Sequence, residues 1–412
     1  MSRFLFVPLP LAGHVFPADA VAQELAARGH DVRWVGAEKK LRSWIGPGPV
    51  IYPTGMRPYR GQGDIKLASV RSLWAEFVLP FTKFTLPAVE KAVQASQPDV
   101  VVVDQHAFAG ALVAERHGLP WATMASSSME LTHPYAHMPK VDAWIRGHQE
   151  TLRAAARLPA GSASPDLRFS PYLVIAFLSA AFTGDYPFPA HYALVGPSLA
   201  PRPEKPGFPW DWLDPARRHV LVTVGTMAES NASGSGDFYV RAVQALRPLR
   251  DQVQGILIAP AGEVPDPPEN VLVMPRVPLL DLMTRLDLVV CHGGQNTVCE
   301  TLSRGVPLVI APLTRDQPIN AQRVADLGAG LRVRFGRVTP AQLREAILTI
   351  LRDRSYRAAA ERIRDSFTEA GGAAAAAARL ESLARQPALA GAPAHPSASA
   401  PPATHRPAGS LL

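Results

Sequence analysis

The chain has 412 residues, of which 47% are hydrophobic, enough for two domains with a core each. Lys and Arg (42) exceed Asp and Glu (35), which gives a formal net charge of +7, but the charges are scattered along the chain. Because no dense basic run with interleaved aromatic residues occurs, the pattern argues against nucleic-acid binding and favours attraction of a small anionic substrate.

The N-terminal residues 1–13 have an arginine ahead of apolar residues, as in a signal peptide, but two prolines interrupt them and no small-residue cleavage site follows. The longest apolar run, 172–182, is shorter than the about 20 residues that a membrane-spanning helix needs. We therefore expect a soluble protein with no membrane partner. The cysteines, Cys291 and Cys299, have no metal-ligand spacing and favour a reduced, cytoplasmic setting.

The first half of the chain alternates apolar strands with helical patterns, which is typical of a doubly wound α/β domain. Strands are predicted at 4–7, 31–35, 100–103, 121–125, 173–177 and 192–195. Helices are predicted at 18–28, 67–93 and 107–117. Residues 46–63 are rich in Gly and Pro and are predicted to be irregular, and the segment from 126 to about 165 is predicted to be mobile.

The second half repeats this architecture after a proline-dominated stretch, 196–215, that indicates an interdomain linker. Its predicted strands are 219–224, 256–259, 271–274, 288–291 and 308–311. Its predicted helices are 341–351, 356–367 and 373–384. Beyond residue 386 the chain is Pro, Ala and Ser with few large apolar residues, which predicts a disordered tail.

The stretch 286–322 carries the clearest chemical signal. An apolar strand ends in His292-Gly293-Gly294, and a helix then opens at Gln295-Asn296-Thr297. Glycines at a strand-to-helix turn let the backbone approach a phosphate closely, and the helix N-terminus offers free N–H groups and partial positive charge. The stretch therefore predicts a nucleoside-diphosphate site.

Three motifs together resemble a known family. They are Gly13-His14 with Pro17 followed by AQELAARGHDV, the sequence HGGQNTVCE from His292 to Glu300, and the pair Asp316-Gln317. From residue 4 to about 384 the chain resembles the family-1 natural-product glycosyltransferases of actinomycetes, which have the GT-B fold. The resemblance implies two Rossmann-like, doubly wound domains that face a cleft, with the acceptor on the first and the donor on the second. The corresponding division is an acceptor domain 1–198, a linker 199–216, a donor domain 217–385 with terminal helices, and a tail 386–412.

The reaction implied by the resemblance is displacement of a nucleoside diphosphate at the anomeric carbon of a sugar. His14 is the candidate base, since an imidazole can take a hydroxyl proton near neutral pH. Asp104 ends a strand of the same predicted sheet and is expected to pair with His14, although it could instead cap the following helix or simply close the strand.

The donor residues are carried over from the family pattern. His292 is expected to touch the diphosphate, Glu300 to hold the ribose hydroxyls, and Thr226 to bind phosphate. The remaining donor candidates are Gly294, Asn296 and Thr297 at the helix start, Asp316 and Gln317 for sugar hydroxyls, and Arg276 and Val277 beside the nucleobase. Arg276 stands where plant relatives have a tryptophan, so the identity of the base stays open. Taken singly, a glycine turn, helix caps and a solvated glutamate would also explain these residues.

The acceptor side is less determined. Candidate residues for an apolar acceptor cavity are Trp74, Phe81, Met124, Met129 and His133, although the helical Trp74–Phe81 stripe also suits a core. We expect a nucleotide-sugar donor (dTDP- or UDP-) and a small-molecule aglycone, no cofactor, no metal and a possible homodimer. A non-catalytic GT-B auxiliary protein and a sugar-nucleotide epimerase are the alternatives.

Overall fold

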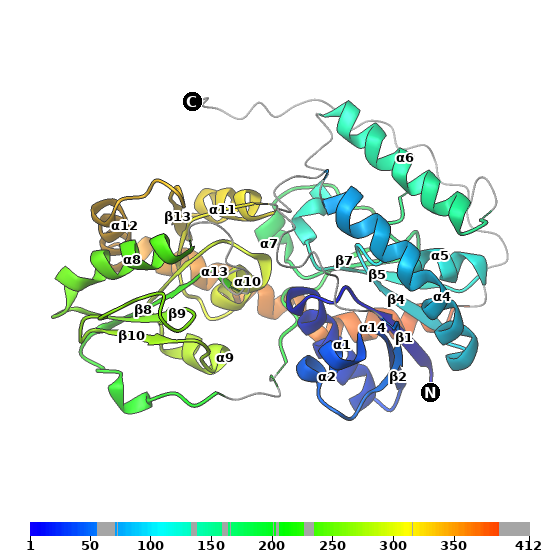
Figure 1. The fold of residues 1–412 in the computed structure, drawn as a ribbon, viewed down its shortest axis with the longest axis horizontal. Helices are drawn as coiled ribbons and strands as arrows, with labels where there is room; N and C mark the ends of the chain where they lie inside the picture. The colour runs from blue at the N-terminus through cyan, green and yellow to red at the C-terminus, as the bar shows by residue number, and fades with distance from the viewer. Residues whose placement is uncertain are drawn as a thin grey trace.

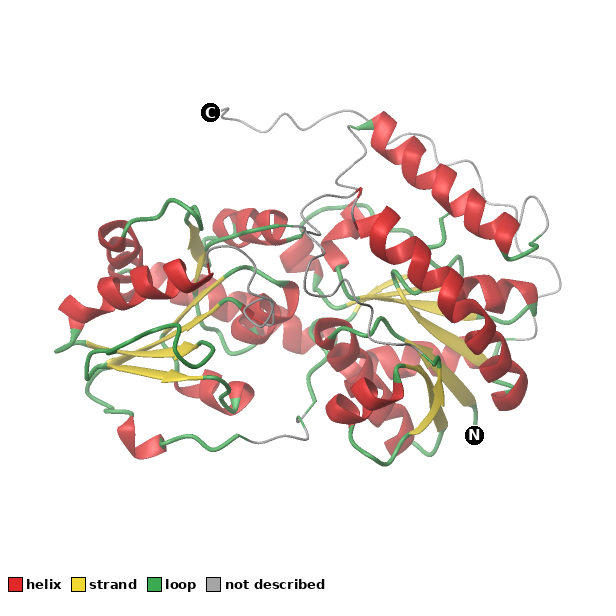
Figure 2. Ribbon diagram, viewed as in Figure 1, coloured by secondary structure: helices red, strands yellow, loops and turns green. Residues whose placement is uncertain are grey.

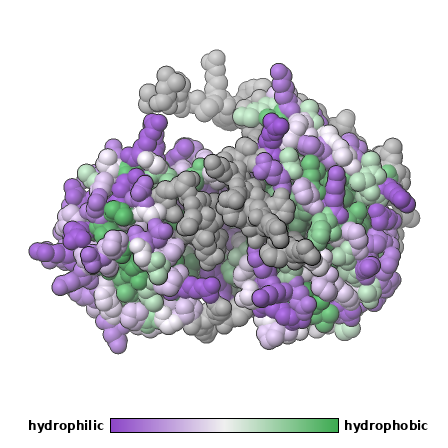
Figure 3. Space-filling view, viewed as in Figure 1, coloured by the Kyte–Doolittle hydropathy of each residue, from purple (hydrophilic) through white to green (hydrophobic). Residues whose placement is uncertain are grey.

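A computed structural model describes residues 1–55, 71, 73–132, 138–158, 164, 166–200, 202, 206–225, 235–314 and 316–386. Figure 1 shows two lobes side by side, and Figure 2 shows that each is a sheet with helices on both sides. Among the described residues, no helix combines the length and apolar character needed to cross a bilayer. On the face seen in Figure 3, hydrophilic side chains are spread over both lobes, with smaller hydrophobic groups between them.

The first sheet is parallel throughout and, in the described residues, has the strand order β3-β2-β1-β4-β5-β6-β7. Its strands are β1 (Arg3–Val7), β2 (Asp31–Gly36), β3 (Val50–Pro53), β4 (Val100–Asp104), β5 (Trp121–Ala125), β6 (Leu173–Ala176) and β7 (Tyr192–Leu194). The helices around it are α1 (Ala12–Ala27), α2 (Glu38–Ile45), the π-helix Leu73–Val78, α4 (Leu79–Ser96), α5 (Ala109–Arg116), α6 (Pro139–Ala155) and α7 (Ala180–Thr183). The central strands are continuous apolar runs because helices bury both of their faces.

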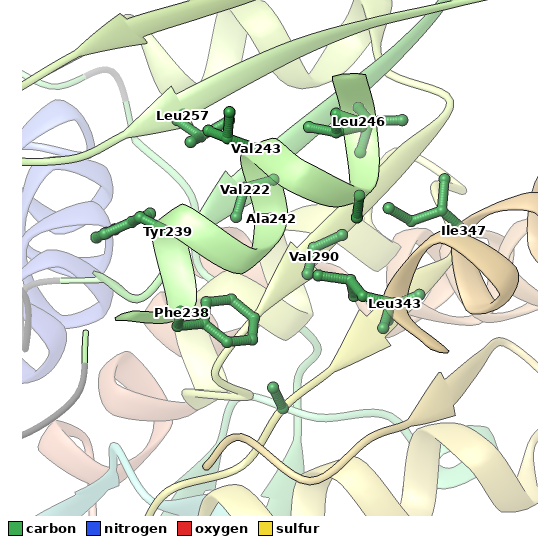
Figure 4. Packing of buried hydrophobic residues seen from close by; sticks show 14 of the residues in the cluster. Val222, Phe238, Tyr239, Ala242, Val243, Leu246, Leu257, Val290, Leu343 and Ile347 are labelled. Atoms are coloured by element: carbon green, nitrogen blue, oxygen red, sulfur yellow. The ribbon is translucent and has the colours of Figure 1, made fainter. Parts of the chain in front are cut away.

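The second sheet is also parallel, with the order β10-β9-β8-β11-β12-β13 in the described residues. Its strands are β8 (Arg218–Thr223), β9 (Val253–Ile258), β10 (Val271–Met274), β11 (Leu288–Cys291), β12 (Leu308–Ile310) and β13 (Gly330–Arg332). Its helices are α8 (Ser235–Leu246), α9 (Leu279–Leu282), α10 (Gln295–Leu302), α11 (Gln317–Asp326), α12 (Pro340–Arg352) and α13 (Arg354–Ala370). Figure 4 shows one face of this core, where Phe238 and Val243 of α8 and Leu343 of α12 pack over Val222 and Val290 of the central strands.

Each sheet reverses its strand order between two neighbouring strands, β1 and β4 in the first and β8 and β11 in the second. In doubly wound sheets, ligands bind outside the carboxyl ends of the strands at such a point. The predicted Rossmann-like architecture is therefore confirmed, and each lobe has one place favoured for a site.

The last helix, α14 (Gly372–Ala384), leaves the second lobe and packs on the first sheet, as the orange segment in Figure 1 shows. Leu380 and Leu383 are buried in the core of that sheet, and Glu381 accepts hydrogen bonds from Arg28 and His30. The domain boundaries inferred from the sequence stay predictions. Helix α14 follows α13 of the second lobe and packs on the first sheet, so it connects the two lobes.

Several segments differ from the sequence-based expectation. The stretch predicted to be mobile contains α6, whose buried residues Ile145, Gln149 and Leu152 are spaced three or four apart on one face. The stretch predicted to be irregular contains β3, a short edge strand that pairs with β2. Neither was apparent from the sequence, because β3 lies among glycines and prolines and α6 is mostly polar.

Candidate active site

His14 lies in the first turn of α1, just beyond the carboxyl end of β1, because this helix begins six residues before the predicted start at residue 18. The helix begins at Ala12, so Pro17 lies inside it. Pro17 has no N–H, and the carbonyl of Gly13 therefore lacks the helical donor that position 17 would normally supply. Asn296 of α10 supplies a donor instead, because its Nδ2 lies 2.9 Å from the Gly13 oxygen.

The structure brings His14 and Asp104 together. His14 Nδ1 lies 2.8 Å from Asp104 Oδ2, and Ser126 Oγ lies 2.7 Å from the same nitrogen and 2.8 Å from the same carboxylate oxygen. The carboxylate can only accept, so Ser126 donates its hydroxyl proton to Asp104 and the Nδ1–H of His14 points at both oxygens. This arrangement places the ring proton on Nδ1 and leaves the lone pair of Nε2 for a substrate.

Asp104 is buried, and its second oxygen accepts a hydrogen bond of 3.0 Å from the backbone N–H of His106. Burial alone would raise the pKa of Asp104, but the charge and hydrogen bond of His14, together with His106, hold the pKa below its ordinary value. The carboxylate therefore stays ionised and can stabilise a protonated His14. Two of the three readings of Asp104 are realised together, since one oxygen closes the turn after β4 and the other pairs with His14. Asp104 does not cap α5, whose N-cap is Phe108.

Ser126 was missed by sequence reasoning, which placed it at the start of the segment predicted to be mobile. Its position at the carboxyl end of β5, next to β4, is the signal that could have identified it.

Two neighbouring cavities open at this edge of the first sheet and share Val7 and Pro8. The smaller one spans about 180 Å³ of space, part of it open to solvent, and is lined by His14, Asp104 and Met124 among others. The larger one contains about 320 Å³, part of it open to solvent, and its walls are mostly apolar, with Phe81 and Val89 among them. The pair forms an apolar space that reaches the His14–Asp104 pair.

Two of the predicted acceptor residues therefore line these cavities, namely Phe81 and Met124. Trp74 lines neither of them and packs in the core against Phe108, with ring centroids 5.3 Å apart. His133 and the side chain of Met129 lie outside the described residues.

The predicted phosphate-binding turn lies at the switch point of the second sheet. His292 follows β11, Gly293 has a positive φ of 88°, and Gly294 is the N-cap of α10. Because the N-cap is a glycine, no N-cap side chain bonds the first N–H groups of this helix. Free N–H groups at a helix start favour an anion, and the diphosphate site stays a prediction.

His292 is packed between two glycines. A Cβ added to Gly225 would lie 2.6 Å from Cε1 of the ring, and one added to Gly294 would lie 2.6 Å from Nε2. Burial lowers the pKa of His292 to about 4, and Nδ1 has no hydrogen-bond partner among the residues that the structure describes. His292 is therefore neutral near pH 7 and can offer a diphosphate a hydrogen bond, but not the positive charge that would neutralise it.

Two further candidate residues of α10 contact parts of the chain outside the second lobe. Asn296 contacts Gly13, and Glu300 is buried and forms an ion pair with Arg202 of the predicted linker. Thr297 lies between them, half-buried. Thr226, predicted to bind phosphate, lies outside the described residues.

Asp316 and Gln317 open α11, as the helix-start alternative suggested, with Asp316 as the N-cap. Gln317 Oε1 accepts hydrogen bonds from the backbone of Leu313 and Thr314, which fixes the loop after β12. Asn320, which sequence reasoning missed, donates to Asp316 and to the carbonyl of Gly293 and so joins this helix to the phosphate-binding turn.

Arg276 is exposed and Val277 is buried, just after β10 on the same lobe. Gln295, also missed, is buried at the start of α10, and neither of its amide atoms has a hydrogen-bond partner within the described part of the chain. An unpartnered buried amide is costly, so a ligand at this helix start would offset that cost. The described residues contain no group of three or more His, Cys, Asp or Glu side chains able to hold a metal ion.

Known proteins match both lobes. Residues 12–132 match the glycosyltransferase family 28 N-terminal domain, and residues 256–383 match the erythromycin biosynthesis protein CIII-like C-terminal domain. Demethyllactenocin mycarosyltransferase of Streptomyces fradiae is 30% identical over 419 residues, which cover 93% of this chain and 87% of that enzyme. The chain belongs to the natural-product glycosyltransferases.

Solved structures of other glycosyltransferases share the fold of this one. The kitacinnamycin glycosyltransferase superposes with a TM-score of 0.76 at 25% identity and covers 93% of this chain and 99% of its own. The spinosyn rhamnosyltransferase SpnG complexed with thymidine diphosphate has a TM-score of 0.71 at 23% identity, with 92% and 100% of the two chains covered. The predicted GT-B fold is thus confirmed, and this glycosyltransferase has its two switch points in the two lobes of that fold.

Proposed function

We propose that this glycosyltransferase transfers a sugar, with inversion at the anomeric carbon, from a dTDP- or UDP-sugar to a small apolar natural-product aglycone. The observation that carries the proposal is the His14–Asp104 pair, 2.8 Å apart, in the wall of an apolar cavity at the switch point of the first sheet.

In this proposal His14 is the general base. With its ring proton on Nδ1, held by Asp104 and Ser126, His14 takes the proton of an acceptor hydroxyl on Nε2. The acceptor oxygen forms a bond to the anomeric carbon while the bond from that carbon to the diphosphate oxygen breaks. The electron pair leaves with the nucleoside diphosphate, and direct displacement inverts the anomeric centre.

The leaving diphosphate is assigned to the start of α10. Its backbone N–H groups and the positive end of its dipole favour negative charge, and neutral His292 adds a hydrogen bond. Glu300, one turn further along α10, is assigned to the ribose hydroxyls. No step of this proposal requires a metal. The thymidine diphosphate in the spinosyn rhamnosyltransferase complex supports dTDP as the first nucleotide to test.

The acceptor is assigned to the two cavities at the edge of the first sheet. Their walls combine Pro8, Phe81 and Val89 with few polar groups, which suits a hydrophobic aglycone whose hydroxyl reaches His14. Names of relatives such as 4'-demethylrebeccamycin synthase and oleandomycin glycosyltransferase favour an antibiotic-like acceptor.

The test is a matrix of reactions that pairs dTDP- and UDP-sugars with aromatic and macrolide aglycones and is read by mass spectrometry. A glycosylated aglycone is expected for at least one pair.

The His14→Ala variant should bind the nucleotide normally but lose turnover. A matched control is His117→Ala, which changes an exposed histidine on the same lobe that pairs with Glu90. Full turnover in His14→Ala contradicts the base assignment. Nucleotide-sugar binding without any product would favour an auxiliary protein, and interconversion of nucleotide sugars without an aglycone would favour an epimerase.

A further inference from the structure

A residue of the predicted linker contacts the carboxylate that the proposed function assigns to ribose. Arg202 Nη2 and Glu300 Oε1 form an ion pair, although the two residues lie 98 positions apart in the sequence. No other hydrogen bond to this carboxylate occurs among the described residues. Glu300 Oε2 is therefore available to a ligand while Oε1 is held.

The ion pair matters because Glu300 is buried. Its side chain is 7% exposed, whereas that of Arg202 is 29% exposed. A buried carboxylate without a partner would take up a proton or pay a large desolvation cost. Burial raises the pKa of Glu300, and Arg202 opposes that rise through its charge and its hydrogen bond.

Arg202 is itself held in place by the first lobe. Its guanidinium lies over the ring of Phe16, 4.7 Å from the ring centroid, which is within the range of a cation–π contact. Phe16 belongs to α1, two residues after His14. Near by, Ser198 Oγ donates a hydrogen bond of 2.9 Å to the carbonyl of Pro17, so the chain before Arg202 is also fixed to α1.

We propose that Arg202 is a positioning residue of the donor site: it keeps the Glu300 carboxylate ionised and oriented, so that the second oxygen can accept hydrogen bonds from ribose hydroxyls. The proposal rests on the assignment of Glu300 to the nucleotide. Through Arg202 and Phe16, it also connects the donor-binding carboxylate to the helix that carries His14. This role could not be inferred from the sequence, since the motif that identifies Glu300 does not include the linker.

Other titratable side chains surround α10 without taking over this role. Cys299 lies on the helix itself, Asp316 lies at the start of α11, and Glu361 and Arg364 of α13 lie against Gly305 just beyond its end. Among the described residues, Arg202 is the one side chain that lowers the pKa of Glu300. Removal of Arg202 should therefore move the titration of Glu300 to higher pH.

The experiment measures the affinity of the full chain for dTDP and for UDP by calorimetry between about pH 5.5 and about pH 8.5. For Arg202→Gln we expect affinity close to that of the wild type at the alkaline end. Towards acid pH the affinity should fall by up to about 10-fold per pH unit, beginning at a higher pH than in the wild type, because a protonated Glu300 accepts hydrogen bonds poorly. Arg202→Lys, which keeps the charge, should restore most of the wild-type pH profile.

Three further variants make the result specific. Arg285→Gln removes an exposed arginine that stacks on Trp210 at 4.9 Å and should leave the pH profile unchanged. Glu300→Gln should weaken binding without this pH dependence, and Arg202→Gln should have no further effect in that background.

An Arg202→Gln protein that binds as the wild type does, binds more tightly, or loses affinity equally at every pH would overturn the proposal. Unchanged affinity in Glu300→Gln would instead contradict the assignment of ribose to Glu300, and with it the donor side of the proposed function.

Discussion

Asn296 Nδ2 donates a hydrogen bond of 2.9 Å to the carbonyl of Gly13, the acceptor that Pro17 leaves without its helical N–H. A proline that looks like a helix-start signal in the sequence thus creates a docking point for the other lobe. Through this bond the helix of the predicted diphosphate site holds the turn that carries His14. The two halves of the proposed chemistry are therefore in direct contact.

This relationship predicts that positions 17 and 296 are energetically coupled. Pro17→Ala supplies an N–H that can satisfy Gly13, so Asn296→Ala should cost less in that background than in the wild type. We expect a coupling of about 0.5–1.5 kcal/mol, the net value of one hydrogen bond, in a double-mutant cycle on kcat/KM. Strictly additive effects would show that the bond does not contribute to the active arrangement.

Asp104→Asn should lower kcat by roughly 100- to 10,000-fold, the usual contribution of acid–base catalysis, with little change in nucleotide affinity. An amide can donate to Nδ1 of His14 and so favour the tautomer that has no lone pair on Nε2. Because the pKa of Asp104 is depressed, its ionised form persists at any pH above its ordinary value, and the stability linked to it is lost only as the pH falls through the depressed value.

The matched control for this prediction is Asp99→Asn, just before the other end of β4, where the carboxylate accepts a hydrogen bond from the backbone of Arg3. In steady-state kinetics, kcat should be strongly lowered in Asp104→Asn and close to the wild-type value in Asp99→Asn. An Asp104→Asn enzyme as active as Asp99→Asn would remove Asp104 from the mechanism.

Much of this fold could be predicted from short-range patterns. The strand of four consecutive valines that ends at Asp104 has to lie inside a parallel sheet, and parallel strands bring their carboxyl ends to one edge. That rule allowed Asp104 to meet His14, the family resemblance implied the pairing, and the two side chains do meet. The HGGQNT turn could likewise be placed because a strand, glycines and a helix start follow one another within a few residues.

Two other contacts across long sequence separations were not predicted. Ser126 joins His14 through the neighbouring strand β5, and Arg202 reaches Glu300 from the linker. Nothing local to Arg202 distinguishes it from an ordinary surface arginine, and only its place at the carboxyl end of β5 distinguishes Ser126 from an ordinary serine. Likewise, α14 was assigned to the second lobe by its place in the sequence, whereas its buried leucines pack on the first sheet.

Gly225→Ala should weaken dTDP binding at least about 10-fold, since the added methyl group at a positive φ of 64° would displace the His292 ring from the diphosphate turn. Gly207→Ala is a matched control, because nothing lies within 4 Å of its Cβ position. Calorimetry with both variants measures the difference. If the two glycines tolerate alanine equally, the packing of His292 is not what shapes the nucleotide site.

The buried, neutral state of His292 predicts how stability depends on pH. In the unfolded chain this histidine takes up a proton near pH 6.5, but in the folded protein only near pH 4. The unfolded state therefore binds more protons between these values, and folding stability falls as the pH drops from about 6.5 to about 4, by roughly 3 kcal/mol for this residue. Above pH 6.5 the histidine is neutral in both states and has no such effect.

In His292→Asn this component of the pH dependence should disappear, although the variant loses stability at neutral pH through poorer packing. The measurement is urea unfolding of both proteins at several pH values within that window, with the difference between them isolating His292 from the other histidines. Since the same neutral imidazole is proposed to donate to the diphosphate, dTDP affinity of the wild type should show no titration of His292 near pH 6.5. Parallel stability curves for the two proteins would mean that His292 has the same pKa in the folded and unfolded states, and the buried, neutral state assigned to it would then be wrong.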